Sequence, residues 1–75
     1  MNLSPLERKF LEMVAKNQLI TKNELKTKLN IDGSALDTAA SGLVSKRLVA
    51  TVSPVGSTCY AITQHGTRLL EQLNE

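Results

Sequence analysis

The 75 residues of this chain are enough for one domain with a small hydrophobic core, and the net charge of +2 permits nucleic-acid binding without requiring it. A single cysteine excludes an intramolecular disulfide, and one cysteine with one histidine cannot supply a four-ligand zinc site. No run of about 18 apolar residues and no apolar leader are present, so we expect a cytoplasmic protein. We expect no cofactor and no enzymatic activity, because no phosphate-binding glycine loop or recognisable catalytic set is present.

The basic residues are concentrated in the first part of the chain. Residues 1–31 hold six Lys or Arg against three Asp or Glu, whereas residues 32–75 hold three against four. The excess positive charge is therefore expected on the first two helices predicted below, and the remainder of the domain is expected to be nearly neutral.

The first predicted helix covers residues 5–17. Ser4 can act as its N-cap, Pro5 suits the first helical position, and Glu7 completes a capping box. Apolar residues recur on one face at helical spacing: Leu6, Phe10, Met13 and Val14. Leu19 and Ile20 then form a short apolar link, which we expect to be extended and able to pair with a later hairpin.

The second predicted helix covers residues 22–29 and repeats the capping-box pattern with Thr21 and Glu24. Leu25 and Leu29 are one turn apart and are predicted to face inward. Asn30 suits the left-handed position that closes a helix. Its lysines, Lys22, Lys26 and Lys28, are left toward solvent. They form either a stripe that contacts phosphates or an ordinary solvated helix face.

The third predicted helix covers residues 34–47, with Ser34 as its expected cap. The inward face is predicted to hold Leu36, Ala39 or Ala40, Leu43 and Val44. The outward face is predicted to hold Ser34, Asp37, Thr38, Ser41 and Ser45. Gly42 lowers helix stability by about 1 kcal/mol relative to Ala, which suggests that another backbone, or the backbone of a ligand, approaches closely there.

Two β-rich runs, residues 49–53 and 58–62, flank a turn with Pro54 and Gly56 and predict a hairpin. Alternation places Val52, Tyr60 and Ile62 on its inward face. Thr63 is then expected to cap a last helix over residues 64–73, in which Leu69, Leu70 and Leu73 form an apolar stripe.

This order predicts one α+β, mainly α domain over residues 1–75. It is a winged helix-turn-helix with a three-helix core, a two-stranded β-hairpin wing and a C-terminal helix. The chain resembles the winged-helix domains of MarR-like transcriptional regulators in four segments with matching spacing. These are Ile20–Leu25, Ile31–Ser34, Leu43–Val49 and Ile62–Gly66, followed by the pair Leu69-Leu70.

The resemblance implies a DNA-binding regulator that places its third helix in the major groove and its wing along the backbone. It implies base and phosphate contacts from Ser34, Ala35, Asp37, Thr38 and Ser41, and wing contacts from Ser57 and Thr58. The remaining candidates are cationic: Lys22, Lys26, Lys46 and Arg47. Lys46 and Arg47 either anchor the DNA backbone or interact with the C-terminal end of the helix dipole.

Similar regulators often carry Arg near the positions held here by Gly33, Thr38 and Gly42. Short hydroxyl side chains discriminate bases poorly compared with a bidentate Arg, so we expect weak, salt-sensitive binding to double-stranded DNA by a monomer. MarR-like proteins dimerise through helices that flank the winged domain. A homodimer of this chain is expected to use Leu69, Leu73 and Leu3.

The uncharged outward face of the third helix also supports an alternative function. On that interpretation the chain is a protein-interaction module that keeps the winged-helix scaffold and binds a larger regulator or complex instead of DNA. Salt-dependent binding to a duplex distinguishes the two hypotheses.

Overall fold

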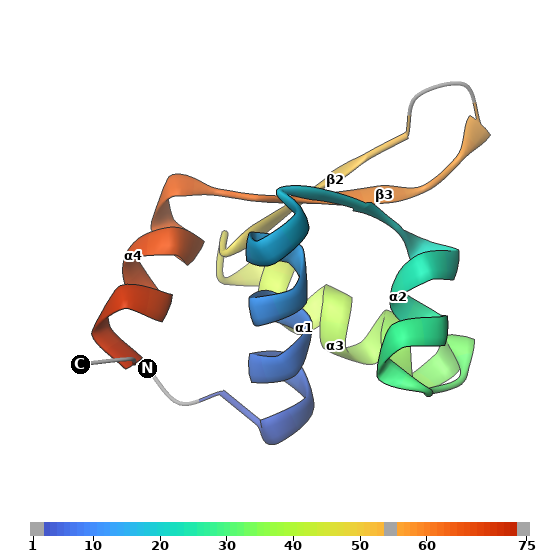
Figure 1. Ribbon diagram of the computed structural model, residues 1–75, viewed down its shortest axis with the longest axis horizontal. Helices are drawn as coiled ribbons and strands as arrows, with labels where there is room; N and C mark the ends of the chain where they lie inside the picture. The colour runs from blue at the N-terminus through green and yellow to red at the C-terminus, as the bar shows by residue number, and fades with distance from the viewer. Residues whose placement is uncertain (1–2, 54–55, 74–75) are drawn as a thin grey trace.

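The computed structural model describes residues 3–53 and 56–73. Its elements, in chain order, are α1 (Pro5–Asn17), β1 (Leu19–Thr21), α2 (Lys22–Leu29), α3 (Gly33–Ser45), β2 (Val49–Val52), β3 (Cys59–Ile62) and α4 (Gln64–Leu73). Figure 1 shows the sheet running across the top of the molecule with the helices below it, and the β2–β3 hairpin projecting past α2. The predicted turn residue Pro54 lies outside the described residues.

The hairpin is part of a three-stranded antiparallel sheet with the order β1-β3-β2. Ile20 pairs with Tyr60, and on the other side of β3 Val49 pairs with Ile62. The predicted pairing of the Leu19-Ile20 link with the hairpin is therefore confirmed. Because β1 joins α1 to α2, this pairing fixes the start of α2 beside the wing.

The predicted caps of α1, α2 and α4 are present. Ser4 and Glu7 exchange both hydrogen bonds of a capping box, at 3.0 and 3.1 Å. The Thr21 hydroxyl accepts from the Glu24 backbone N–H at 3.1 Å and donates to the Glu24 carboxylate at 3.1 Å. The cap of α2 is thus present, but the predicted capping box is incomplete, because the Glu24 carboxylate bonds to the Thr21 hydroxyl and not to its backbone N–H. The Thr63 hydroxyl accepts from the backbone N–H of Gly66 at 3.0 Å. Each cap acts over three residues, which is why the sequence pattern could predict it.

The predicted third helix is wrong at both ends. Its cap is Asp32, whose carboxylate accepts from the Ala35 backbone N–H at 2.7 Å, and not Ser34, which lies inside the first turn. The helix ends at Ser45 because Arg47 adopts a left-handed backbone with φ of 62°. The N–H of Arg47 bonds to the Val44 carbonyl and that of Leu48 to the Leu43 carbonyl, which is a Schellman termination.

The core lies between α1, α3 and the sheet. Its largest fully buried side chains are Phe10, Leu11, Val14, Ile20, Leu25, Leu36, Leu43, Leu48 and Val49. The Phe10 ring meets the Tyr60 ring edge-on, with centroids 5.2 Å apart, which ties α1 to the central strand. No helix among the described residues is long and apolar enough to cross a membrane.

Two residues that were predicted to face inward are exposed. Val44 is 38% exposed and Val52 is 40% exposed, whereas Ala39 and Ala40 are both buried. Val52 lies at the outer end of β2, where the hairpin extends beyond the helices in Figure 1. The small side chains on α3 face the core because α1 packs closely against that helix.

Two glycines permit close approaches. A Cβ on Gly42 would meet the Glu7 carboxylate of α1, so the element that approaches α3 there is a side chain and not another backbone. A Cβ on Gly66 would clash with the Leu48 carbonyl oxygen and would lie 2.8 Å from Cδ1 of Ile62. Gly66 therefore holds α4 against the end of α3 and the start of β2.

Candidate nucleic-acid interface

The outward face of α3 is polar and open. Ser34, Asp37, Thr38 and Ser41 are exposed along it, and Ala35 is half-buried at its edge. They are presented to solvent because Leu36, Ala39, Ala40 and Leu43 turn the other side of the helix into the core. The Thr38 hydroxyl donates to the Ser34 carbonyl at 3.0 Å, which leaves its oxygen free to accept a hydrogen bond.

An ion pair joins the start of α2 to this face. Lys22 Nζ lies 2.8 Å from Asp37 Oδ1, with the two side chains 34% and 61% exposed. The hydrogen bond that Lys22 donates to the Asp37 carboxylate raises the pKa of Lys22. Lys22 was predicted to face solvent; its side chain is only partly exposed, and a carboxylate on the neighbouring helix binds its ammonium group.

Lys22 also lies at the base of the wing. Its backbone N–H donates to the Thr58 carbonyl at 2.9 Å. A polar hollow of about 330 Å³ lies between the start of α2 and the wing, lined by Thr21, Lys22, Asn23, Gly56, Ser57 and Thr58. The fold thus brings Lys22, Ser57 and Thr58 around one hollow, and the ion pair with Asp37 links Lys22 to the outward face of α3.

The described part of the wing carries no positive charge near its tip. Ser53, Gly56 and Ser57 are exposed and Thr58 is half-buried there. These side chains offer hydroxyl groups at most, which can bond to phosphate oxygens but cannot neutralise them.

The other three cationic candidates differ in their surroundings. Lys26 is half-buried, and a methyl group placed on Gly33 would lie 3.9 Å from its Nζ, so its ammonium lies beside the first turn of α3. Lys46 Nζ lies 3.7 Å from Glu7 Oε2 of α1. Arg47 is exposed, at the left-handed position that follows α3.

Glu7 connects the Lys46 side of α3 to the cap of α1. The hydrogen bond from the Ser4 backbone N–H lowers the pKa of Glu7, partial burial opposes that shift, and the nearby Lys46 adds to it. The Glu7 side chain is only 16% exposed and lies over Gly42. Lys46 is thus held by α1, an interaction that neither predicted alternative for this residue included.

Sequence reasoning missed the two contacts that tie the cationic side chains to carboxylates. Lys22 and Asp37 belong to different helices, as do Lys46 and Glu7, so no helical or strand spacing relates the members of either pair. Within the described part of the chain, no cluster of three or more His, Cys, Asp or Glu could hold a metal ion.

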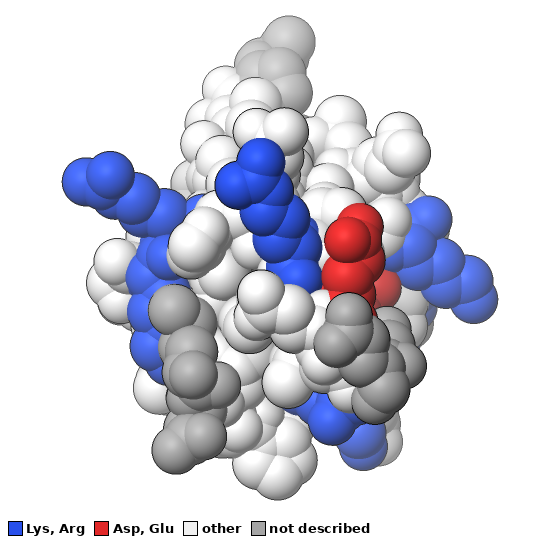
Figure 2. All heavy atoms as spheres, turned by 90° about the vertical axis from the view of Figure 1, so that its left-hand side faces the viewer, with Lys and Arg blue, Asp and Glu red and all other residues white. Residues whose placement is uncertain are grey.

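Two of the residues predicted to form a dimer interface, Leu69 and Leu73, belong to α4. Figure 2 shows the side of the molecule that carries α4, where basic side chains are scattered over a largely uncharged surface. Leu70 of α4 is buried, and Leu3, Leu69 and Leu73 are partly buried against the core. The predicted dimer residues are therefore at least partly used within the domain itself.

No protein-family profile matches the chain, and no curated protein matches its sequence. Several solved structures are similar over nearly all of it, including the three described next. BldR, a transcriptional regulator from Sulfolobus solfataricus, has a TM-score of 0.89 and 25% identity, and the match covers 99% of this chain and 55% of that protein.

A mutant MarR from E. coli, solved with operator DNA, has a TM-score of 0.87 and 27% identity, and the match covers 95% of this chain and 53% of that one. ZitR from Lactococcus lactis, a zinc-responsive MarR family member, has a TM-score of 0.86 and 14% identity, and the match covers 99% of this chain and 53% of ZitR. This chain spans about half the length of each of these three proteins.

The predicted fold class and resemblance are confirmed. The chain has the mainly helical winged helix-turn-helix fold, and its structural neighbours are MarR-family transcriptional regulators.

Proposed function

We propose that this chain is a small DNA-binding transcriptional regulator that places α3 in the major groove and the hairpin wing along the backbone. The supporting observation is that Lys22 lies between the wing, where it contacts Thr58, and the exposed polar face of α3, where it pairs with Asp37. These are the elements that a winged helix offers to a duplex. The structural likeness to a MarR that was solved with operator DNA adds support.

In this proposal the residues divide into two groups. Ser34, Thr38 and Ser41 contact base edges or phosphates through their hydroxyl groups, and Ala35 packs against the groove wall. The cationic contacts to phosphates come from Lys22, Lys26, Lys46 and Arg47. Arg47 is the most accessible of these, because it is exposed whereas the other three are half-buried.

The arrangement favours weak binding by a monomer. Asp37 directs a carboxylate toward the same surface, and its ion pair with Lys22 makes that part of the interface neutral. Phosphate neutralisation supplies most of the sequence-independent affinity for DNA, so we expect micromolar or weaker binding that falls with salt. A homodimer would raise the affinity by joining two half-sites.

The proposal needs no cofactor and assigns no catalytic residue. A regulator of this kind acts on DNA in the cytoplasm.

One observation favours the alternative function, a protein-interaction module. An open hollow of about 550 Å³ borders α3, lined by Ser4, Leu6, Glu7, Ala35, Thr38, Ala39 and Gly42. Most of these side chains are small or apolar, and the hollow reaches Ala35 and Thr38 on the same face that is proposed to meet DNA. A partner protein that filled it would compete with a duplex.

Fluorescence anisotropy of a labelled duplex, titrated with protein at ~50 mM and ~200 mM salt, tests the proposal. We expect binding that weakens at the higher salt and weakens further in the double variant Lys22→Ala and Lys26→Ala. The matched control is Lys9→Ala with Lys16→Ala, which removes the same charge from α1, outside the proposed interface.

The control variant should bind more tightly than the interface variant. Equal losses in the two would mean that only net charge matters. No binding at tens of micromolar protein in the lower salt would refute autonomous DNA binding and favour the protein-interaction module.

A further inference from the structure

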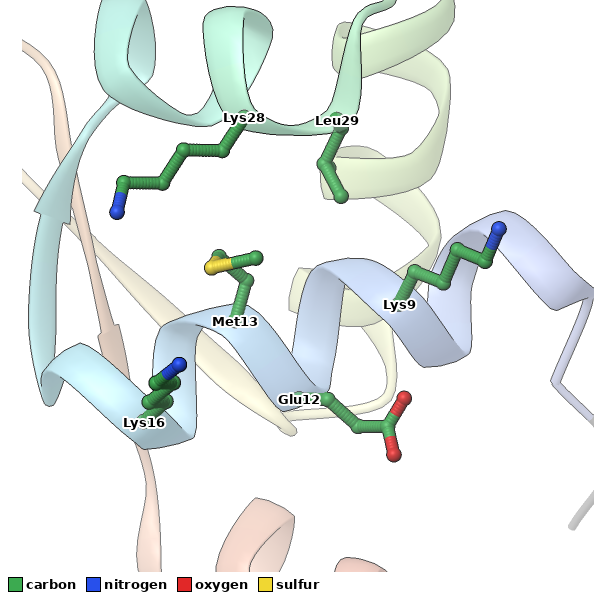
Figure 3. A pocket seen from close by; sticks show the side chains of 6 residues that line it. All are labelled: Lys9, Glu12, Met13, Lys16, Lys28 and Leu29. Carbon is green, nitrogen blue, oxygen red and sulfur yellow. The ribbon is translucent and has the colours of Figure 1, made fainter.

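A second cationic surface lies between α1 and α2. It is an open groove of about 300 Å³ lined by Lys9, Glu12, Met13, Lys16, Lys28 and Leu29, and we call it the α1–α2 groove. In Figure 3 the groove faces the viewer and α3 lies behind the two helices. None of its lining residues belongs to the proposed DNA interface, so that function does not explain them.

The charge of this groove is not balanced within the domain. Lys9, Lys16 and Lys28 take part in none of the ion pairs among the described residues, which join Arg8 to Glu12, Lys22 to Asp37 and Lys46 to Glu7. The groove holds three lysines and one glutamate, which leaves six basic and six acidic residues in the rest of the chain. The net charge of the groove residues therefore equals the net charge of the whole protein, +2.

The single acidic residue of the groove is turned away from it. Oε2 of Glu12 lies 4.0 Å from Nε of Arg8. In Figure 3 the Glu12 carboxylate points away from α2. The Lys16 and Lys28 side chains extend from opposite walls toward the space that contains Met13. The groove therefore offers cationic groups on both walls.

The floor of the groove is apolar. Met13 and Leu29 are half-buried and pack against the hydrophobic core. A flexible thioether side chain adapts to differently shaped apolar groups. An occupant that combined carboxylates with one apolar side chain would match both features, because the carboxylates would pair with the lysines while the apolar group covered the floor.

We propose that the α1–α2 groove binds an acidic peptide segment of a partner protein, with one apolar side chain of the peptide inserted over Met13 and Leu29. A peptide suits the groove better than a second duplex does, because a phosphate backbone has no apolar group to cover the floor. The site lies on other elements than the outward face of α3, so this interaction can occur together with DNA binding or without it.

The test uses a fluorescein-labelled synthetic peptide in which Glu residues surround a central Leu-Phe pair. Anisotropy titrations should give saturable binding to the wild-type protein. Replacing Glu with Gln, or Leu and Phe with Ala, should weaken binding in each case. The charge reversal Lys28→Glu should weaken binding by about fivefold or more, because it replaces an attractive charge by a repulsive one.

Arg68→Glu on α4 is the matched control, since it changes the net charge equally at an exposed residue outside the groove. It should alter the affinity by less than about twofold. The double variant Lys9→Gln and Lys16→Gln is a second test that leaves α2 unchanged, and it should also weaken peptide binding. Backbone amide NMR shifts should move at Met13 and Leu29 and stay unchanged at Thr38 and Ser41.

Several outcomes would overturn the proposal. These are the absence of peptide binding, equal losses in the Lys28 and Arg68 variants, and amide shifts confined to the outward face of α3. Displacement of the peptide by duplex DNA, with equal loss of DNA binding in the groove variants, would make the groove a phosphate-binding surface instead. A chain that bound the peptide but no DNA would support this proposal while the proposed regulatory function failed.

Discussion

Lys22 at the start of α2 and Asp37 on the outward face of α3 form an ion pair with 2.8 Å between Nζ and Oδ1. The pair lies where α2 and α3 meet beside the wing. A DNA phosphate that approached Lys22 would have to compete with the carboxylate already bound to it. We infer that Asp37 limits the affinity of this surface for DNA.

We predict that Asp37→Asn strengthens binding to a mixed-sequence duplex by about three- to tenfold and steepens the dependence of log K on log salt by about 0.9. The amide removes a negative charge from the interface and frees Lys22 for a phosphate. In the Lys22→Gln background the same substitution should give a smaller gain, because it still removes the negative charge of Asp37 but releases no ammonium group for a phosphate. Anisotropy titrations at several salt concentrations measure both effects.

Glu71→Gln on α4 neutralises an exposed carboxylate outside the proposed interface and serves as the control for net charge. An equal gain in this variant, or an undiminished gain in the Lys22→Gln background, would show that the ion pair has no special role. Asp37→Asn should keep the wild-type melting temperature, because exposed ion pairs contribute little to folding.

We predict that Gly66→Ala destabilises the domain by about 2 kcal/mol or more. The added methyl would clash with the Leu48 carbonyl oxygen, which belongs to the backbone and cannot move aside cheaply. Gly33→Ala is the matched glycine control, because its methyl would meet only Lys26 Nζ, at 3.9 Å. It should change the free energy of unfolding by less than about 0.5 kcal/mol. Urea denaturation followed by circular dichroism compares the two.

We predict that Asp32→Ala lowers the free energy of unfolding by about 1 kcal/mol, whereas Ser34→Ala changes it by less than about 0.5 kcal/mol. Asp32 accepts the hydrogen bond from the Ala35 backbone N–H, and the Ser34 side chain makes no hydrogen bond to the start of α3 among the described residues. The same urea experiment applies. A larger loss of unfolding free energy from Ser34→Ala than from Asp32→Ala would show that Ser34, and not Asp32, caps α3.

Glu7 should make stability depend on pH below about 4.5, its ordinary pKa. The hydrogen bond from the Ser4 backbone N–H, with Lys46 nearby, lowers the pKa of Glu7 in the folded state. Its carboxylate therefore stabilises the fold above the unfolded pKa, and this stabilisation is lost as the pH falls through the lower folded pKa.

Thermal melts of wild type and Glu7→Gln between about pH 6 and pH 3 test this expectation. The difference between their melting temperatures should shrink toward acidic pH. The variant Glu12→Gln on the same helix is the control, and its difference from wild type should depend less on pH. A constant difference for Glu7→Gln over the whole range would contradict the expected role of its carboxylate.

Features that depend on neighbouring residues could be predicted from the amino-acid sequence. The Ser4–Glu7 box, the Thr21 and Thr63 caps and the left-handed Asn30 each involve groups within about one helical turn, so spacing alone identifies them. The hydrophobic periodicity determined which helix faces turn inward, and with the order of elements it was sufficient to predict the winged-helix fold.

Hydrophobic periodicity could not determine how far neighbouring elements cover an apolar face of a helix or strand. It assigned Val44 and Val52 to the core, but both are well exposed, because neighbouring elements do not fully cover the side of α3 or the outer part of the hairpin. Residue type also did not distinguish Asp32 from the predicted Ser34 as the cap of α3, since both Asp and Ser favour that position.

The partners of the charged side chains became clear from the packing of the helices. It paired Lys22 with Asp37 and Lys46 with Glu7, and it gathered Lys9, Lys16 and Lys28 around one groove. The physical reason is that hydrogen bonds within a helical turn are set by local backbone geometry, which nearby residues specify. Contacts between charged side chains on different helices depend on how those helices pack around the shared core, and no local pattern encodes that distance.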